Sequence, residues 1–237
     1  MKIVVSDKVF KMFPGYVRHV LIARNADNAG ENAELLALLR EEESRILNDY
    51  SFGDFKNHPR IASWRAAFEK FGMNPNQCPP SVASLIKRVR GGKELPYVNS
   101  LVAIFNIVSM RYVIPAGGDD LSKVKGDIAL KPADGSETYV PLGSRDVAEH
   151  PKPGEIILCD TGDGDVFCRA WCWKNGDRSK IESNTKLVAI NIDALPPVTA
   201  KEGFSAAENA VALVKRYCGA DVTINVLSAE NGSIDLP

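Results

Sequence analysis

Near residue 113 the spacing of the apolar residues changes from helical to β-like, and this change decides the fold class. Residues 58–112 predict three helices, two of which are opened by proline and closed by glycine. The third, residues 99–112, is apolar nearly all round and is expected to be buried. After residue 113, short runs rich in β-branched and aromatic residues alternate with turns that contain glycine. This order predicts an α+β fold in which helices pack on a mainly antiparallel sheet system.

Residues 1–57 are expected to form an N-terminal α/β extension, with residues 58–237 as the main domain. The extension combines two β-like runs with one long amphipathic helix. The expected helices are residues 31–47, 60–71, 81–90, 99–112 and 205–218. The expected strands are residues 3–5, 16–23, 127–131, 138–142, 155–160, 165–173, 186–193 and 222–227.

Charge and cysteine usage narrow the class of protein. The chain has 29 Lys and Arg against 30 Asp and Glu, a net charge of −1, whereas proteins that hold nucleic acid by charge alone are strongly basic. RNA could therefore bind only through a local patch. The first eight residues lack the apolar run of a signal peptide, and no apolar run is long enough to span a membrane. Five cysteines without framework spacing indicate reduced thiols, so we expect a soluble cytoplasmic protein with no membrane partner.

No metal and no cofactor is expected from the motifs. Cys168 and Cys172 are four residues apart, but no Cys-x-x-Cys is present, and buried thiols are the simpler interpretation. The acidic run 160–165 does not fit a calcium loop, because a loop that begins at Asp163 would need glutamate where Lys174 stands. Its glycines are typical of a tight turn between two strands. The phosphate-binding and dinucleotide-binding glycine motifs and the nucleophile elbow are all missing.

A basic cluster and a polar segment are the remaining candidates for function. The cluster, either a solvated helix end or a phosphate-binding patch, consists of Lys87, Arg88, Arg90 and Lys93. Asn99 and Asn106 lie on one face of the helix predicted at 99–112, where they either bond neighbouring loops or form a polar pocket wall. Residues 168–179 predict a strand with alternating aromatics that leads into a turn bearing Asp177 and Arg178. That pair is either solvated or part of a pocket rim.

Four segments, residues 58–75, 79–110, 114–137 and 168–185, resemble the editing domain of the phenylalanyl-tRNA synthetase beta chain, also called the B3/4 domain. More specifically, they resemble the free-standing proteins built around that domain. The resemblance implies a β-sandwich of unusual topology flanked by helices, in three layers. It also implies hydrolysis of the ester that links a wrong amino acid to tRNA. In the synthetase the editing pocket separates tyrosine from phenylalanine through the phenolic hydroxyl.

The resemblance places individual residues. Asn106 matches the asparagine of the family's Thr-Asn-Tyr segment, and Asp120 matches the aspartate of its Asp-Leu pair. The family's histidine falls on Gly117. Gly176 matches the glycine before the substrate-sensing glutamate, whose own place holds Arg178. Both side chains that make the synthetase pocket specific for tyrosine are therefore replaced, and an arginine favours an acceptor group or a phosphate.

Two functions follow as expectations: a free-standing editing factor that deacylates mischarged tRNA in trans, or a non-catalytic module that binds tRNA or a small amino-acid-like ligand. No nucleophile with an adjacent base stands out, so a positioned water is the expected route to hydrolysis. We expect Arg178 to stand near Trp171 or Trp173, to pair with Asp177 or Asp120, and to face a cleft lined by Asn106. The expected catalytic residues are Asn106, Asp120 and Asp177; the expected substrate-binding residues are Asn99, Arg169, Arg178, Gly117 and Gly176; the expected RNA-binding residues are Lys87, Arg88, Arg90 and Lys93.

Overall fold

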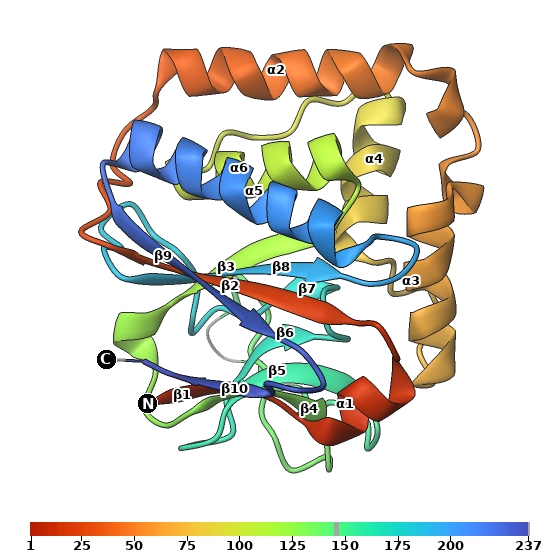
Figure 1. Cartoon of the computed structure of the whole chain (residues 1–237), viewed down its shortest axis with the longest axis vertical. Helices are drawn as coiled ribbons and strands as arrows, with labels where there is room; N and C mark the ends of the chain where they lie inside the picture. Colours follow the sequence, from red (N-terminus) through yellow and green to blue (C-terminus); the bar gives the residue numbers. More distant parts are fainter. Residues whose placement is uncertain (145–146, 237) are drawn as a thin grey trace.

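A computed structural model describes residues 1–144 and 147–236 and has three layers (Figure 1). Most of the helices form the upper layer, a four-stranded sheet the middle layer and a six-stranded sheet the lower layer, while helix α1 (Asp7–Met12) lies beside the lower sheet and α3 (Pro59–Lys70) along one side. This arrangement confirms the predicted α+β class and the layered sandwich. Among the described helices, none is long and apolar enough to cross a membrane.

The two sheets have different pairing patterns. The four-stranded sheet is entirely antiparallel. Among the described strands of the six-stranded sheet, only β1 (Lys2–Val5) and β4 (Ile128–Pro132) pair in parallel. The middle sheet has the order β3 (Ala116–Asp120), β8 (Val188–Ala194), β2 (Val17–Arg24), β9 (Asp221–Leu227). The lower sheet has the order β10 (Ser233–Asp235), β1 (Lys2–Val5), β4 (Ile128–Pro132), β5 (Ile156–Asp160), β6 (Val166–Arg169), β7 (Lys174–Asn175).

Local signals explain where the helices start and stop. Pro59 occupies the first turn of its helix, where the missing N–H costs nothing. Thr199 and Glu202 form a reciprocal capping box, and Gly219 ends the same helix in the left-handed conformation. The helices are α1 (Asp7–Met12), α2 (Ala33–Asn48), α3 (Pro59–Lys70), α4 (Ser81–Arg90), α5 (Ser100–Tyr112) and α6 (Ala200–Cys218).

Alternation along β8 divides the interior into two parts. Val188, Ile190 and Ile192 face the helices and join the upper hydrophobic core. The intervening residues face the lower sheet, and two of them, Asn191 and Asp193, are polar. Polar groups are therefore buried between the sheets close to the β3 edge, which positions the site described below.

Residues 1–57 contribute strands to both sheets. Strand β1 lies between β10 and β4, and β2 lies between β8 and β9. The segment predicted to be an N-terminal extension, residues 1–57, is thus paired into both sheets with strands from residues 58–237.

Three local predictions were wrong or incomplete. Residues 138–142 were expected to be a strand but form only isolated bridges. The strand expected over 165–173 ends at Arg169, because Ala170 and Trp171 have φ of 45° and 65° and turn the chain away. Strand β3 was not expected, since its sequence Ala-Gly-Gly-Asp-Asp contains no good strand former and pairing with β8 supplies its order.

Candidate functional site

A cleft wraps around β3, the edge strand of the middle sheet. Its lower lobe, about 250 Å³, lies between the two sheets, and its upper lobe, about 420 Å³, lies between β3 and the helices α4 and α5. Gly117, Gly118 and Asp119 line both lobes, and so do Trp173 from the turn after β6 and Asn175 from β7. We call this feature the β3 cleft.

The glycines keep the strand between the lobes thin. A Cβ on Gly117 would meet no atom within 4 Å, so it would project into open space. A Cβ on Gly118 would lie 2.9 Å from the carbonyl oxygen of Ala189 and 2.9 Å from Cζ of Phe105. Gly118 is therefore required by packing, whereas the absence of a side chain at Gly117 leaves room for a ligand.

Gly118 also presents an open backbone N–H to the cleft. The N–H of Asp193 on β8 donates to the Pro115 carbonyl, and the Leu121 N–H donates to the carbonyl of Leu187, directly before β8. The backbone groups of the odd-numbered residues 117 and 119 between them therefore point toward β8. The N–H groups of Ala116 and Asp120 point the other way and donate to Ser109 Oγ and to the carbonyl of Ser179. By the same alternation Gly118 N–H points outward between them, and no acceptor for it is found in the described part of the chain.

The lower lobe is polar and deeply buried. Arg18 on β2 is only 1% exposed and forms a bidentate ion pair with Asp193, with Nε–Oδ1 and Nη2–Oδ2 distances of 2.7 and 3.0 Å. The phenol of Tyr16 donates to the same carboxylate. Asn191 and Trp171 complete this end of the lobe. A fixed charge pair beside an amide and an indole gives the lobe a set of hydrogen-bonding groups held in place by the sheets.

Asp119 is the titratable group that both lobes share. Its side chain accepts a hydrogen bond of 2.7 Å from the Ser179 hydroxyl and is almost fully buried. Burial raises the pKa of Asp119 to about 6, although the Ser179 hydrogen bond and the Arg18 charge favour the ionised form. A carboxyl with that pKa can accept a proton near neutral pH, as a general base requires.

The lower lobe also contains Cys168 and Cys172, which stay protonated. Burial raises the pKa of both thiols well above the usual range. Neither is therefore a ready nucleophile or metal ligand. Within residues 1–144 and 147–236, no three His, Cys, Asp or Glu side chains gather as a metal site would require.

The upper lobe is mainly apolar, and two amides, Asn106 and Asn175, line it. Leu85, Val102 and Phe105 form its walls. Asn106 on α5 is partly buried and lines this lobe, so it lies in the same cleft as Gly117. Both residues were predicted as site residues, and the structure brings them together.

Other expected site residues hold the fold and do not line the cleft. Asp120 accepts hydrogen bonds from Ser122 and from Thr185 Oγ1, and thereby fixes the turn after β3. Asp177 accepts from the Gly143 N–H and from Lys180 Nζ. Asn99 caps α5, since its Oδ1 accepts from Val102 N–H and its Nδ2 donates to the Ile181 carbonyl.

The position expected for Arg178 was wrong. Its side chain is half-exposed and pairs with Asp165, neither of the two carboxylates expected, and it does not line the lobe that contains Asn106. Arg169 is buried in an ion pair with Glu155 and also contacts Glu149, so its guanidinium is fully engaged in the lower sheet. Gly176 is packed there too, because a Cβ would lie 2.6 Å from the Val166 carbonyl.

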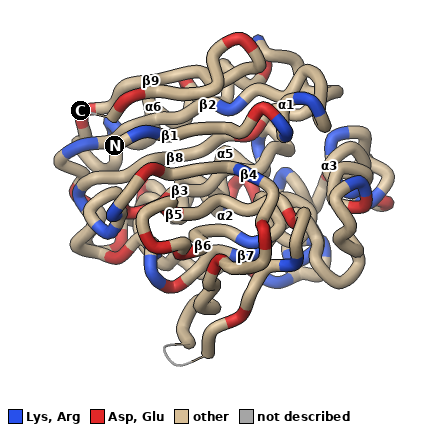
Figure 2. The backbone as a smooth tube through the Cα atoms, turned by 90° about the horizontal axis from the view of Figure 1, so that it is seen from below, with Lys and Arg blue, Asp and Glu red and all other residues tan. Residues whose placement is uncertain are grey.

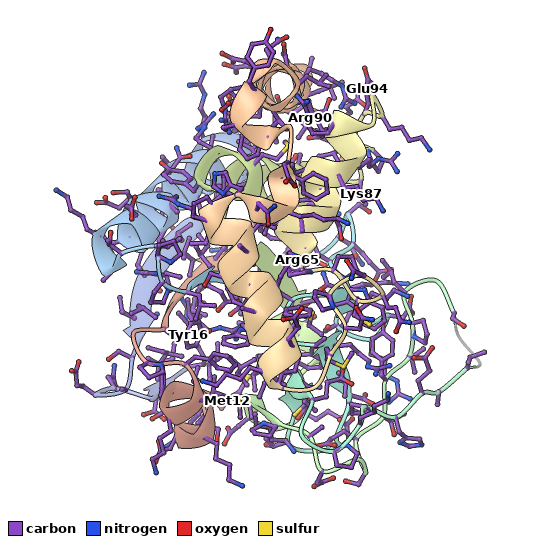
Figure 3. The ribbon with its side chains drawn as sticks, turned by 90° about the vertical axis from the view of Figure 1, so that its right-hand side faces the viewer. Met12, Tyr16, Arg65, Lys87, Arg90 and Glu94 are labelled. Carbon is purple, nitrogen blue, oxygen red and sulfur yellow. The ribbon has the colours of Figure 1, made fainter. Side chains whose placement is uncertain are left out.

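The basic cluster is divided by the structure. Arg90 donates to the Leu47 carbonyl and closes the end of α2, and Arg88 donates to the Glu94 carbonyl. Lys87 and Lys93 are exposed. Figure 3 shows Lys87 and Arg90 on the face that also carries Arg65 of α3. Helix α4 starts at the cleft with Ser81 and Ser84 and carries Lys87 one turn further on, so the exposed cations lie close to the cleft.

Several residues of the cleft were not predicted from the sequence as site residues, among them Arg18, Gly118, Asp119 and Asn191. Arg18, Asn191 and Asp193 interrupt otherwise apolar strands at inward-facing positions, which is a signal that the sequence does contain. The adjacent pair Asp119-Asp120 is visible as well, but only the pairing of β3 decides which aspartate enters the cleft.

Comparison with known proteins places the chain in a family. The family model of the B3/4 domain matches residues 63–219. One similar solved structure is an N-terminal fragment of the phenylalanyl-tRNA synthetase beta-subunit from Pyrococcus horikoshii, with 13% identity and a TM-score of 0.47. The alignment covers 92% of this chain and 49% of that one, so the chain spans about half the length of the fragment. A comparison with curated proteins gave no match. Since the family model matches most of the chain, this protein belongs to the B3/4 domain family.

Proposed function

We propose that this protein hydrolyses the ester of a mischarged aminoacyl-tRNA in trans, with the ester carbonyl against β3. The observation that carries the proposal is the juxtaposition in one cleft of an outward N–H on Gly118 and the buried carboxyl of Asp119. The relation to the B3/4 domain supports a tRNA-related role. A cytoplasmic location, where charged tRNA is found, is part of the same proposal.

The proposed reaction needs a water and no covalent intermediate. Asp119 accepts a proton from the water as its oxygen attacks the ester carbonyl carbon, and the Gly118 N–H donates to the oxygen that becomes negative. The ester C–O bond then breaks, and Asp119 returns the proton to the leaving ribose oxygen. The products are a free amino acid and a tRNA with an unesterified terminal ribose. Because an aminoacyl ester is intrinsically labile, holding the water and the carbonyl in line supplies most of the rate.

Asn106 is assigned to substrate orientation in this proposal. Its amide lies in the upper lobe beside Gly117 and Gly118, and it can donate to one substrate oxygen while accepting from a hydroxyl. Asp120 and Asp177 act indirectly, through the segments that they fix on either side of the Ser179–Asp119 hydrogen bond.

Helix α4 is the proposed contact for the tRNA backbone. Seen from below, acidic and basic residues are interspersed over the six-stranded sheet, a poor surface for a polyanion (Figure 2). Helix α4 instead carries the exposed Lys87 and Arg88, and the exposed Lys93 follows in the loop after it. Phosphates held there would direct the aminoacylated end toward Ser81 and Ser84.

Purified full-length protein should be incubated with a panel of tRNAs, each charged with a non-cognate amino acid, and the remaining ester followed over time. Each tRNA in buffer alone measures spontaneous hydrolysis. We expect at least one member of the panel to be deacylated well above that background. Background rates for the whole panel would refute the hydrolase proposal.

One observation favours a second function, a non-catalytic module that binds tRNA or a small amino-acid-like ligand. Gly117 stands where the synthetase domain has a histidine, so a group that the family uses is missing from the cleft. A gel shift of intact tRNA that weakens with salt, without any hydrolysis in the panel, would select this function.

A further inference from the structure

Two residues that line the lower lobe each carry a buried N–H group without a hydrogen-bond acceptor in the described part of the chain. The two groups are Nη1 of Arg18 and Nε1 of Trp171. Buried donors without a partner are rare in folded proteins, and two beside one cavity call for an explanation. A ligand that supplies the acceptor is one.

The fold holds both side chains in place. The Asp193 carboxylate already accepts from Arg18 Nε and Nη2 and from the Tyr16 hydroxyl. The indole of Trp171 is held by edge-to-face contacts with the rings of Tyr16 and Trp64, whose centroids lie 4.8 and 5.0 Å from its own. Its φ of 65° is rare for a non-glycine residue, and such strained positions cluster where a site is pre-organised.

The remaining groups of the lobe determine the charge of the ligand. Arg18 and Asp193 neutralise each other, and Asp119 adds a carboxyl with one oxygen bonded to Ser179. An anionic ligand group would face two carboxyls, and a cationic one would face the guanidinium. A neutral group that both accepts and donates matches the lobe, because it can accept from Arg18 or Trp171 and donate to Asp119 or Asn191.

We propose that the lower lobe binds a neutral amino-acid side chain that ends in a hydroxyl or a carboxamide, and that Arg18 and Trp171 reject apolar side chains of the same shape. The proposal rests on the function proposed above, in that it places the amino acid of the substrate in this lobe. Discrimination arises because an apolar side chain of equal size leaves both buried donors unpaired. Specificity is thereby assigned to positions other than Gly117 and Arg178, where the synthetase domain has its histidine and glutamate.

Binding can be tested without hydrolysis by titrating the full chain with amino-acid amides in a calorimeter. The probes are two pairs matched in shape, L-threonine amide with L-valine amide and L-asparagine amide with L-leucine amide. We expect the polar member of each pair to bind at least about tenfold more tightly, the contrast typical of a hydrogen-bonding site. Equal affinities within each pair, or no binding of either polar amide, would overturn the proposal.

Matched tryptophan variants locate the effect. Trp171→Phe keeps an aromatic ring but removes Nε1, so the preference for threonine amide should fall about fivefold or more. Trp64→Phe is the control: Trp64 is equally buried, its Nε1 has no partner among the described residues, and it does not line the lobe, while phenylalanine keeps a ring against Trp171. Arg18→Lys tests the second donor, since lysine can still face Asp193 but lacks Nη1. An unchanged preference in both Trp171→Phe and Arg18→Lys would refute the assignment.

Hydrolysis separates this proposal from the preceding one. If valyl- and threonyl-tRNA are deacylated equally fast, the side-chain proposal fails while the hydrolase proposal stands. Suppose instead that no tRNA of the panel is deacylated but that threonine amide still binds more tightly than valine amide. The hydrolase proposal then fails, and the proposal that the lower lobe binds a polar side chain stands.

Discussion

Gly117 and Gly118 are neighbours on one strand, yet we predict opposite effects of the same substitution. An alanine at Gly118 would place its methyl 2.9 Å from the Ala189 carbonyl oxygen and 2.9 Å from Cζ of Phe105. One neighbour is backbone and the other is a ring packed in the upper core, so neither can move aside easily. Overpacking of this kind lowers the free energy of unfolding by about 1–3 kcal/mol.

At Gly117 the added methyl meets no atom within 4 Å. Neither glycine has φ in the left-handed region, so alanine fits both backbones. Gly117→Ala should therefore keep or raise the free energy of unfolding, by up to about 1 kcal/mol, because alanine restricts the unfolded chain. Its methyl projects into the cleft, and we expect deacylation to fall although the fold is intact.

Urea unfolding of the two variants measures the contrast directly. We expect the free energy of unfolding of Gly118→Ala to lie about 1–4 kcal/mol below that of Gly117→Ala, with unchanged dependence on urea. Equal stability of the two variants would refute the description of β3 as packed on one face and open on the other. A Gly117→Ala protein with full activity would refute the role of its open space.

Three further predictions concern charge. Burial raises the pKa of Asp119 to about 6, so between about pH 4 and pH 6 the folded state holds a proton that the unfolded state has lost. The free energy of unfolding of the wild type therefore falls as pH rises through this window. In urea titrations, Asp119→Asn should gain about 2–3 kcal/mol relative to the wild type across the same window. Lys87→Ala should weaken tRNA binding and make its salt dependence shallower in fluorescence anisotropy, with the melting temperature unchanged; an unaltered salt slope would remove α4 from the interface. Arg169→Met should lower the free energy of unfolding by about 3–5 kcal/mol because Glu155 is left buried and unpaired, whereas Arg178→Ala, at a half-exposed ion pair, should change it by less than about 1 kcal/mol in the same urea assay.

The helical part of the fold was predictable because its signals are local. Pro59 and the glycines after α3 and α4 mark ends that any chain of this sequence would have. Strand β3 was not predictable in this way. Its order comes from pairing with β8, about seventy residues later, and no property of its own five residues favours a strand.

The site shows the same division. Gly117 was predicted from the resemblance of sequence, and Asn106 from that resemblance and from its place on one face of a helix; both line the cleft. Arg178 was misplaced because a turn was assumed to bring it to the strand end, whereas the chain already turns at Ala170 and Trp171 and Arg178 meets Asp165. Arg18 was missed because its partner Asp193 lies 175 residues away and only the β2–β8 register joins them.

Single-turnover hydrolysis of the mischarged tRNA that the wild-type protein cleaves fastest tests the assignment of the β3 cleft most directly. The comparison needs wild type, Asp119→Asn and, as a control outside the cleft, Arg178→Ala. We predict that Asp119→Asn lowers the rate at least about a hundredfold, as expected for loss of a general base, while Arg178→Ala keeps the wild-type rate. Hydrolysis by Asp119→Asn at the wild-type rate would contradict the assignment of catalysis to this cleft.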